Sequence, residues 1–421
     1  MRISLLTIGS RGDTQPYLAL ALALKARGHQ PRLCAPSNFA ALARGLEVDF
    51  VPVPWDTRQA LEEDGLRRLL LHGDVVGFFR RINRRAWDLR EGLWRAWETA
   101  CDGAQALIPG TTIEDAVLLL GRARGIPVLL NELMPFAPRP DFGPVALGRR
   151  NLGPLNTPLH WAGRQVWWRI NRHGAAALAD RLGLARPWGP PSLAALRQGA
   201  PLLGAYSPSL LPPPTGWDPA RRPVTGAWRL PRAAAQALPG DHLDAGFAAW
   251  LEDGPPPLFL GFGSMPAAGG QDLVELAGDL AEALDLRVVL GAGWSDVDAA
   301  NCDLPENVAI AGDCDYGWLF EHCCGVVHHG GAGTSHTAAA SGLPQVVCPF
   351  FADQPFWAQT LAKAGVATAL PFDRVEAGAL AEAVAQSLEH CADPAAALAA
   401  QIASEPGAAA AAEHVERWLG A

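Results

Sequence analysis

The feature that most constrains this chain is a regular alternation of short apolar strands and helices. Near the start, strands are predicted over residues 2–8, 30–36 and 48–54, with helices in the intervening segments. The first of these helices is expected over residues 17–28, with Thr14 able to cap it and Pro16 in its first turn. Strands joined by helices pair in parallel through right-handed crossovers, so the pattern predicts an α/β fold.

The same alternation begins again at residue 256 and continues to residue 365. A chain of 421 residues also favours two domains, because single hydrophobic cores rarely grow beyond about 250–300 residues. The Pro-, Arg- and Gly-rich stretch 210–241 is typical of a linker. We therefore predict an N-terminal doubly wound domain, a C-terminal doubly wound domain and a final helix, over residues 1–220, 221–405 and 406–421.

Composition excludes several classes of protein. The net charge of −9 argues against a nucleic-acid partner and against strong binding to an anionic membrane. The sequence has no run of 18 apolar residues, so no transmembrane helix is predicted, and the N-terminal apolar run is expected to be a strand rather than a signal peptide. Eight cysteines are scattered without a CxxC pair, which indicates free thiols in the cytoplasm, with peripheral membrane contact as an alternative.

A glycine-rich turn connects a predicted strand to a predicted helix in "VVHHGGAGTSHTAAASGLPQVVCPF", residues 326–350. Gly330, Gly331 and Gly333 allow a tight turn and a close approach of the backbone to a ligand. The helix that begins near Thr334 directs free N–H groups and a positive dipole end toward the carboxyl edge of the sheet. This arrangement suits a diphosphate; the alternative is a plain tight turn with solvent-facing histidines.

Two segments resemble a known family. The segment "HHGGAGTSHTAAASGLPQVVCPFFADQPFWAQTLAKAGVA" is similar to the donor-binding signature of GT-B glycosyltransferases, and "LLTIGSRGDTQPYLALALALKARGH" to their N-terminal motif. Within that group the sequence looks most like sterol 3-β-glucosyltransferases and antibiotic-aglycone glycosyltransferases. The resemblance implies two Rossmann-like domains that face each other across a cleft, with the C-terminal helix returning to the N-terminal domain. It also implies inverting transfer from a UDP-sugar co-substrate, with no further cofactor and no essential metal.

The resemblance also implies roles for residues of the donor site. The diphosphate and the sugar are expected to be held by Ser264, His329, Gly331, Gly333, Thr334, Asp353 and Gln354. Asp353 and Gln354 are expected to bind sugar hydroxyls, and a helix N-cap is the alternative reading of this pair. The backbone of Cys314 is expected to contact uracil, although "CDYGW" departs from the Pro-His-Asp-Trp run that is common in sterol-type relatives.

Asp13 is the predicted catalytic base. It lies in "GSRGDTQP", expected on the loop after the first strand, and inverting transfer needs one base for the proton of the attacking hydroxyl. Antibiotic-type relatives place aspartate at the matching position, which supports this role. The alternative is that Asp13 caps the first helix.

Acceptor residues are predicted less directly. Apolar side chains recur at helical spacing over residues 75–97, so this segment is expected to be one helix with an apolar face. It is read either as an ordinary surface helix or as the wall of an apolar acceptor pocket or a lipid-facing surface. Phe79, Trp87 and Met134 are the predicted acceptor contacts.

The cluster of His322, Cys323, Cys324, His328 and His329 is rejected as a metal site. Neighbouring side chains on a strand point to opposite faces, and the spacing does not match a zinc framework. The sequence as a whole predicts a hexosyltransferase, with glucose as the default sugar and an apolar small molecule such as a sterol or terpenoid as the acceptor. The alternatives are glycosylation of a polyketide or peptide aglycone or of a hydroxy-lipid, and a non-catalytic accessory protein that binds a nucleotide sugar.

Overall fold

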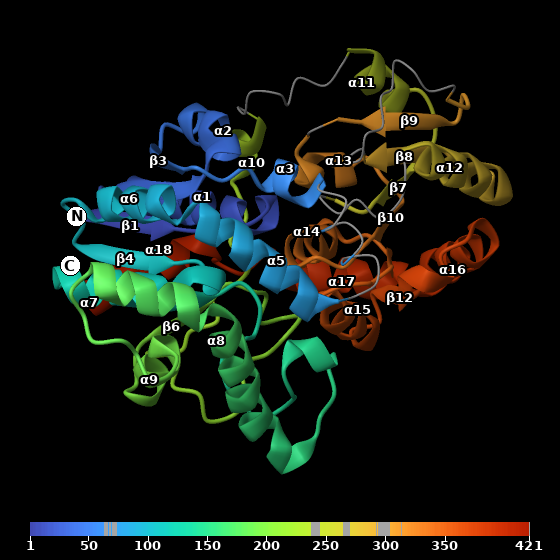
Figure 1. Ribbon diagram of the computed structural model, residues 1–421. Coiled ribbons are helices and arrows are strands. Elements are labelled where there is room, and N and C mark those ends of the chain that lie inside the picture. The colour runs from blue at the N-terminus through green and yellow to red at the C-terminus, as the bar shows by residue number, and fades with distance from the viewer. Residues whose placement is uncertain are drawn as a thin grey trace. The chain divides into compact units, whose positions relative to one another are not determined.

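The computed structural model describes residues 1–62, 66, 69, 74–236, 245–263, 270–291, 293, 304–312 and 314–420. The chain divides into two compact units (Figure 1). The N-terminal unit comprises residues 1–60, 75–231 and 405–421, and the C-terminal unit comprises residues 61–74 and 232–404.

The N-terminal unit is built on a parallel sheet of four strands in the order β3-β2-β1-β4. The strands are β1 (Arg2–Leu6), β2 (Gln30–Pro36), β3 (Asp49–Val53) and β4 (Ala106–Pro109). A second pair of parallel strands is formed by β5 (Leu130–Glu132) and β6 (Leu202–Gly204). An isolated bridge joins Val128, just before β5, to Leu107 of β4. The predicted parallel α/β architecture is present in this unit.

Helices surround this sheet and supply its core. They are α1 (Arg11–Ala26), α2 (Ala40–Gly45), α3 (Thr57–Glu62), α5 (Val75–Asp88), α6 (Arg90–Cys101), α7 (Glu114–Arg124), α8 (Asn156–Arg181), α9 (Pro191–Arg197) and α18 (Ala408–Leu419). Short 3-10 turns lie at Ser37–Phe39, Thr111–Ile113, Val145–Leu147 and Gly153–Leu155. Trp94 and Trp97 of α6 are buried against Leu6 and Val53, so these tryptophans belong to the core.

Two predicted helix boundaries differ from the structure. Helix α1 begins at Arg11 rather than Tyr17, because Ser10 rather than Thr14 is its N-cap, and Pro16 lies inside the helix. The predicted helix over residues 75–97 is two helices, α5 and α6, interrupted at Leu89, whose backbone leaves the helical region at ψ 2°. Amphipathic spacing continues through the break, so the pattern alone does not reveal it.

The C-terminal unit contains a parallel sheet of six strands in the order β12-β11-β10-β7-β8-β9. The strands are β7 (Leu258–Gly261), β8 (Val288–Gly291), β9 (Val308–Ala311), β10 (Gly325–His328), β11 (Gln345–Val347) and β12 (Ala367–Ala369). The helices are α10 (Arg232–Gln236), α11 (Ala245–Glu252), α12 (Gly270–Leu284), α13 (Tyr316–Phe320), α14 (Ala332–Ser341), α15 (Gln354–Lys363), α16 (Ala377–His390) and α17 (Ala392–Ile402), with a 3-10 turn at Phe372–Arg374.

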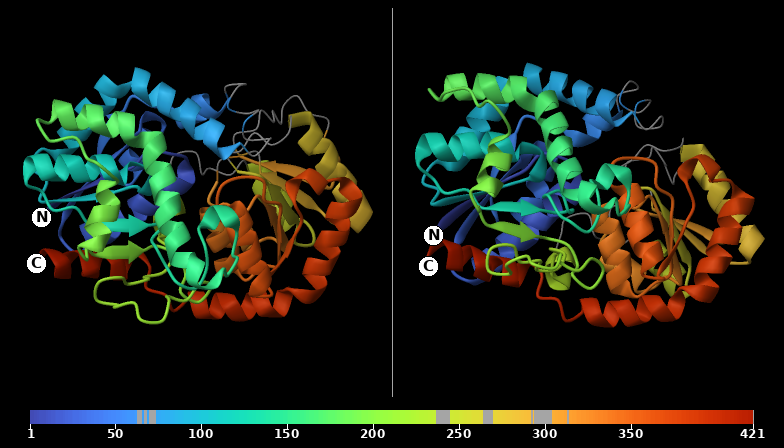
Figure 2. Two further views of the ribbon diagram at one scale, coloured as in Figure 1. Left: turned by 60° about the horizontal axis from the view of Figure 1, so that its bottom comes forward. Right: turned by 90° about the horizontal axis from the view of Figure 1, so that it is seen from below.

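Alternating side chains of these strands feed two cores, one on each face of the sheet. Leu258 and Leu260 pack with α12 and α16 on one face, whereas Phe259 packs with α13 and α14 on the other. This period of two is what a sheet covered on both faces requires. Helices α12 and α16 lie against each other, as the two views of Figure 2 show.

The structural division of the chain falls after Pro231, whereas the predicted boundary falls after residue 220. Residues 221–231 stay with the N-terminal unit because their backbone pairs with β6. Leu202 donates to the carbonyl of Arg221 at 2.9 Å, and Gly204 donates to the carbonyl of Pro223 at 2.8 Å. Proline- and arginine-rich composition therefore does not separate this segment from its unit.

The C-terminal helix α18 packs on α1, so it belongs to the N-terminal unit (Figure 1). Ala411, Ala412 and Val415 are the residues of α18 that are fully buried. Glu416 accepts from the guanidinium of Arg27 at 2.5 Å and lies 2.9 Å from the Nε2 of His29. In the part of the chain that the structure describes, no helix combines the length and apolarity needed to cross a bilayer.

Candidate functional site

The strand order of the C-terminal unit contains one switch point. From β7 the chain proceeds outward through β8 and β9, and it then returns to the other side of β7 as β10, β11 and β12. In open α/β sheets, ligands bind outside the carboxyl ends of the strands at such a point. A ligand site is therefore expected among the residues that follow β7 and β10.

Glycines in the turns after β7 and β10 pack closely on their neighbours, and two of them lie against the ring of His329. Gly330 has φ 87°, a conformation that favours glycine, and a β-carbon there would lie 2.7 Å from Cγ1 of Val347. A β-carbon at Gly263, after β7, would lie 2.8 Å from Cε1 of His329, and one at Gly331 would overlap Nε2 of the same ring. The absence of side chains at 263 and 331 therefore makes room for the imidazole of His329.

The adjacent histidines have different surroundings. His328 is fully buried, with Nε2 3.0 Å from Oε1 of Gln345 and with Nδ1 accepting the N–H of Gly330 at 3.1 Å. His329 is 9% exposed, and its buried Nδ1 has no hydrogen-bond partner among the described residues. Burial lowers the pKa of His328 to about 4 and the pKa of His329 to about 3, so both rings are neutral near pH 7. The ring of His329 therefore offers a neutral hydrogen-bonding group rather than a positive charge.

The N-terminus of α14 lies directly after this turn. Gly331 is its N-cap residue, with φ −62° and ψ 144°, and it provides no capping side chain. The N–H groups of the first helical turn have no acceptor within an α-helix, so those of Ala332, Gly333 and Thr334 can meet an anion. The fully buried hydroxyl of Ser335, one residue further, also lacks a partner among the described residues. The turn and the helix end together present unused polar groups.

Asp353 and Gln354 lie where α15 begins, after β11. Asp353 is the N-cap residue of α15, yet its side chain makes no capping bond; instead its Oδ2 accepts from Nε1 of Trp357 at 2.8 Å. The Oε1 of Gln354 accepts from the N–H groups of Phe350 and Phe351, each at 3.0 Å. The side-chain oxygen of Gln354 is therefore used within its own loop, and the side-chain NH2 group is the part that can donate to a ligand.

The two remaining residues that were predicted to bind the donor are Cys314 and Ser264. The side chain of Cys314 is buried with Leu319 and Phe320 in the core beside α13, which leaves only its backbone for a ligand. Asp315 caps α13 by accepting from the N–H of Gly317 at 3.0 Å. Ser264 lies outside the described residues.

Asp13, the predicted base, lies at the corresponding switch point of the N-terminal sheet. It follows β1, at the border between β1 and β4 where the strand order reverses, and it sits in the first turn of α1 rather than on a loop. Its Oδ2 accepts from the N–H of Ser10 at 2.8 Å and from the hydroxyl of Ser10 at 3.0 Å. A β-carbon at Gly9, with φ 148°, would overlap the carboxylate.

Asp13 therefore caps the first helix, as the alternative interpretation expected, and only one of its two carboxylate oxygens takes part in the cap. Oδ2 completes a capping box with Ser10, whereas Oδ1 has no recorded partner among the described residues. Burial raises the pKa of the Asp13 carboxyl above its ordinary value, against the opposing effect of the bonds from Ser10. A partly buried carboxylate with one free oxygen and a raised pKa is a stronger base than an exposed one.

The predicted acceptor residues Phe79 and Trp87 lie along the contact between α5 and α8. Phe79 packs edge-on to Trp167 at 4.7 Å, and Trp87 lies 4.4 Å from His173 and 4.4 Å from the guanidinium of Arg90. Both aromatic rings therefore contribute to helix packing. Met134 follows β5 and is half-buried.

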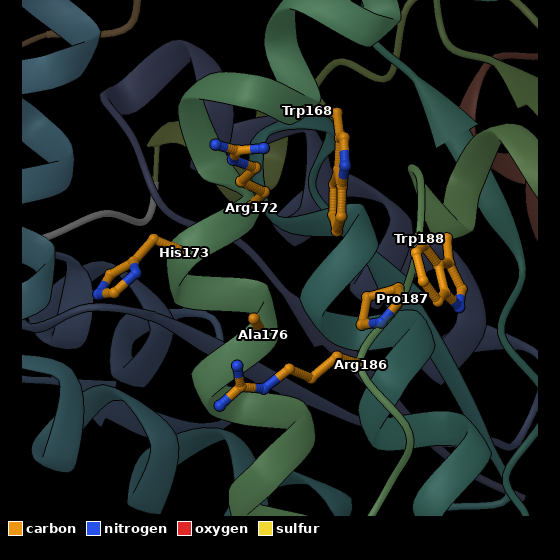
Figure 3. Close-up of a pocket in the computed structure, with 7 residues that line it drawn as sticks. All are labelled: Trp168, Arg172, His173, Ala176, Arg186, Pro187 and Trp188. Atoms are coloured by element: carbon orange, nitrogen blue, oxygen red, sulfur yellow. The ribbon is translucent and has the colours of Figure 1, made fainter.

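A surface hollow of about 330 Å³ has His173 among its lining residues (Figure 3). None of the predicted acceptor residues lines it; the lining residues are Trp168, Arg172, His173, Ala176, Arg186, Pro187 and Trp188. Trp188 is fully exposed, and Arg186 pairs with Asp180 at 2.6 Å. The hollow is thus open to solvent.

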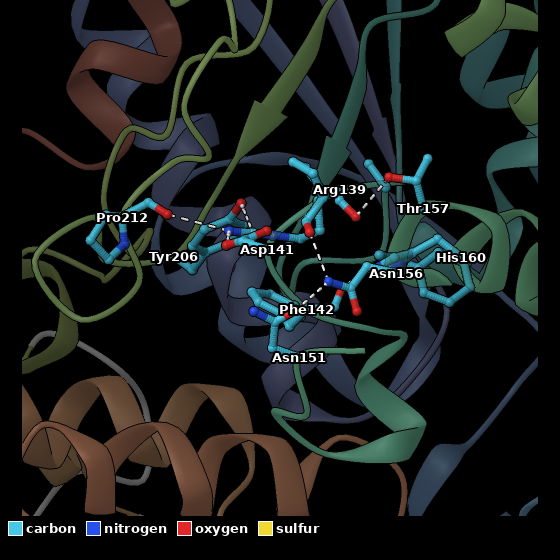
Figure 4. A network of polar contacts seen from close by, with 12 residues as sticks. Arg139, Asp141, Phe142, Asn151, Asn156, Thr157, His160, Tyr206 and Pro212 are labelled. Carbon is cyan, nitrogen blue, oxygen red and sulfur yellow. Dashed lines mark hydrogen bonds and ion pairs between the residues drawn. The ribbon is translucent and has the colours of Figure 1, made fainter. Parts of the chain in front are cut away.

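A buried polar network fixes the segment that follows β5 (Figure 4). Arg139 is fully buried and forms a bidentate pair with Asp141, with both distances 2.7 Å. Its other contacts are the carbonyl of Pro212 at 3.3 Å and the hydroxyl of Tyr206 at 3.4 Å. Burial also lowers the pKa of His160, in the same network, to about 4. This segment is therefore anchored through charge pairing rather than apolar packing alone.

The histidines and cysteines between residues 322 and 329 make contacts of their own. His328 is occupied by Gln345 and Gly330, and the thiol of Cys323 donates to the carbonyl of Leu319 at 3.3 Å. In the described ranges, no three His, Cys, Asp or Glu side chains are grouped so that they could hold a metal ion.

Three residues of the donor region were missed by the sequence analysis. Gln345 supports His328, Gly263 makes room for His329, and Ser335 offers a buried hydroxyl. A glutamine inside the buried strand "PQVVCP" was the available signal for the first, because a buried polar side chain needs a partner. The glycine of "GFGS" was the signal for the second.

Two family models match parts of the chain, one in each unit. Residues 3–93 match the glycosyltransferase family 28 N-terminal domain, and residues 277–417 match the C-terminal domain of erythromycin biosynthesis protein CIII-like proteins. The O-mycaminosyltylonolide 6-deoxyallosyltransferase of Streptomyces fradiae is 32% identical over 99% of this chain and 97% of its own length. The vancomycin aglycone glucosyltransferase of Amycolatopsis orientalis is 32% identical over 88% of this chain and 86% of its own.

Sterol 3-beta-glucosyltransferases are also similar, but they are longer proteins. The protein from Arabidopsis thaliana is 30% identical over 88% of this chain, which spans 60% of that relative, and the chain spans 24% of the one from Neurospora crassa.

Solved structures share the fold. The glycosyltransferase of kitacinnamycin superposes with a TM-score of 0.67 and 22% identity over 99% of this chain and 98% of its own. The spinosyn rhamnosyltransferase SpnG, solved with thymidine diphosphate, gives a TM-score of 0.63 and 20% identity over 99% of this chain and 100% of its own. These likenesses, the two family models and the near full-length relatives agree, and this chain belongs to the GT-B glycosyltransferases that join a family 28 N-terminal domain to an erythromycin CIII-like C-terminal domain.

Proposed function

We propose that this glycosyltransferase moves a hexose, by default glucose, from a UDP-sugar to a hydroxyl of an apolar small molecule such as a sterol or terpenoid. The observation that carries the proposal is the imidazole of His329, whose buried Nδ1 has no hydrogen-bond partner in the part of the chain that the structure describes. It lies in a turn cleared of side chains at Gly263 and Gly331, beside the uncapped start of α14. Unused donors gathered at the switch point of a sheet suit a diphosphate.

The donor is held by groups of different chemistry. The diphosphate meets His329, the N–H groups from Gly331 to Thr334, and Ser264, which stays a prediction. The carboxylate of Asp353 and the amide of Gln354 bind sugar hydroxyls, since together they offer acceptors and donors. The backbone of Cys314 contacts the base.

Asp13 acts as the base. As the acceptor oxygen forms its bond to the anomeric carbon, the bond from that carbon to the diphosphate oxygen breaks and the electron pair leaves with the diphosphate. The proton of the acceptor hydroxyl passes to Oδ1 of Asp13, the oxygen that the capping box leaves free. One displacement inverts the configuration, so an α-linked donor gives a β-glycoside.

The identities proposed for the nucleotide and the acceptor are inferred from the relatives. Antibiotic-type neighbours are named with thymidine diphosphate, so UDP and dTDP must be compared directly. Relatives at similar identity are named for transfer to sterols, to O-mycaminosyltylonolide and to vancomycin aglycone. An apolar alcohol remains the proposed acceptor, contacted by Phe79, Trp87 and Met134, and an antibiotic aglycone or hydroxy-lipid is the alternative. The site of action is the cytoplasm, with peripheral membrane contact as an alternative.

The test is a product search without an assumed acceptor. Purified protein is incubated with labelled UDP-glucose or a dTDP-sugar, an apolar cell extract, a sterol panel and a set of macrolide and glycopeptide aglycones. Mass spectrometry then looks for a labelled hexose on an alcohol, absent with Asp13→Asn. A sterol or terpenoid product supports the proposal, an aglycone product favours the alternative, and nucleotide binding without any product favours the non-catalytic accessory protein.

A further inference from the structure

His328 lies beneath the glycine turn and contacts both the turn and the neighbouring strand. Its Nδ1 is 3.1 Å from the N–H of Gly330, and its Nε2 is 3.0 Å from Oε1 of Gln345 in β11. Both His328 and Gln345 are fully buried, so no solvent competes for these contacts. The proposed donor site does not use this ring as a ligand contact.

The contacts determine where the ring carries its proton. A backbone N–H can only donate, so Nδ1 of His328 must be the unprotonated nitrogen. In a neutral ring the proton is then on Nε2, which donates to Gln345, so that glutamine must present its oxygen. Burial lowers the pKa of His328 to about 4, so the ring stays neutral over the physiological range.

The bond to Gly330 acts at the centre of the turn. Gly330 has φ 87° and packs closely on Val347, and it separates His329 from Gly331, the residue that flanks the His329 ring. The orientation of the peptide at Gly330 therefore influences both the direction of the imidazole of His329 and the entry into α14.

We propose that His328 is a positioning residue, which holds the backbone of Gly330 through Nδ1 and thereby orients His329 and the first turn of α14 for the diphosphate. This inference rests on the proposed donor site. It distinguishes the two adjacent histidines, one that supports the turn and one that meets the ligand.

Two substitutions of His328 separate the two contacts. In His328→Asn the side-chain oxygen takes the place of Nδ1 and can still accept from Gly330, while the contact with Gln345 is lost. In His328→Gln the amide reaches the place of Nε2 and can still bond Gln345, while the acceptor for Gly330 is lost. Each variant removes one buried hydrogen bond, so a merely structural role predicts similar effects of both.

The experiment is calorimetric titration of wild type and both variants with UDP and dTDP, together with thermal unfolding. We expect both variants to unfold at similarly lowered temperatures, His328→Asn to bind within threefold of wild type, and His328→Gln to bind at least tenfold more weakly. Equal affinities of the two variants, or tighter binding by His328→Gln, overturn the inference. If wild type binds neither nucleotide, the proposed donor site fails and the inference fails with it.

A second measurement needs no variant. In protein labelled with ¹⁵N-histidine, the ring nitrogens of His328 are expected to show a protonated Nε2 and an unprotonated Nδ1. A proton on Nδ1 overturns the inference even if the nucleotide binds, so the two failures are distinguishable.

Discussion

The pH at which a histidine side chain takes up a proton depends on its burial, because burial disfavours the charged ring. The unfolded chain binds protons at His328 and His329 below about pH 6.5, whereas the folded C-terminal unit does not until about pH 4 and pH 3. Stability from these two groups is therefore present above pH 6.5 and is lost as the pH falls toward the lowered values. Each proton contributes a slope of about 1.4 kcal/mol per pH unit in that window.

We expect the urea midpoint of the C-terminal unit to fall steeply between pH 6.5 and pH 4.5. In His328→Asn the pH dependence of the free energy of unfolding should lose about one proton's share of this slope. Urea titrations at several pH values measure the slopes. A slope in His328→Asn equal to that of wild type contradicts the assignment of His328 as a buried neutral ring.

The sequence predicted individual residues well where a local pattern determines their place. Asp13 was expected after the first strand, and "GSRGD" places it there whether it acts as a cap or as a base. The division of work between His328 and His329 was not predictable, because it depends on Gln345 and Gly263, which lie far away in the sequence. Burial by distant segments also sets the protonation state, and no local pattern reports it.

At the scale of the elements, the turn between β10 and α14 contains two glycines with different physical requirements. Gly331 has φ −62° and ψ 144°, which alanine adopts without strain, but a β-carbon there overlaps Nε2 of His329. We expect Gly331→Ala to displace the imidazole and weaken UDP binding about tenfold, the equivalent of one hydrogen bond, with a change in stability below about 1 kcal/mol. Calorimetry and thermal unfolding measure the two effects.

Gly330→Ala is the matched comparison. Its φ of 87° strains alanine, and the added carbon would lie 2.7 Å from Val347, so we expect a loss of about 2 kcal/mol or more in the free energy of unfolding. If Gly331→Ala is the more destabilising of the two, or leaves UDP affinity unchanged, the geometry described for the turn is wrong.

Secondary structure was predictable because each strand is short, apolar and bounded by turn residues. The predicted strand over residues 30–36 coincides with β2, and the strand predicted before the glycine-rich turn corresponds to β10. The break between α5 and α6 was not predictable, since apolar spacing continues through Leu89. Strands β4, β5, β6 and β12 were not predicted.

At the scale of the whole molecule, the chain returns at its end to the unit where it began. Val415 of α18 is fully buried, and α18 packs on α1, the helix that carries Asp13. We expect Val415→Asp to lower the free energy of unfolding of the N-terminal unit by about 3 kcal/mol, because a carboxylate replaces a buried apolar side chain. The exposed Ala409→Asp, on the same helix, is the control.

Hydrogen exchange of α1 and α18 measures this effect. Faster exchange in both helices with Val415→Asp, and not with Ala409→Asp, is the expected result. Unchanged exchange in α1 would show that α18 does not support it.

In the mechanism that we propose, the C-terminal unit binds the donor and Asp13 of the N-terminal unit takes the proton. The most direct test is Asp13→Asn, which keeps an oxygen for the capping box with Ser10 but removes the basic carboxylate. Transfer rates with the identified acceptor and UDP affinity by calorimetry are measured on the same preparation. The account predicts a fall in kcat of about 100-fold or more, with UDP affinity within twofold of wild type. A kcat within threefold of wild type, or a loss of UDP binding, would contradict it.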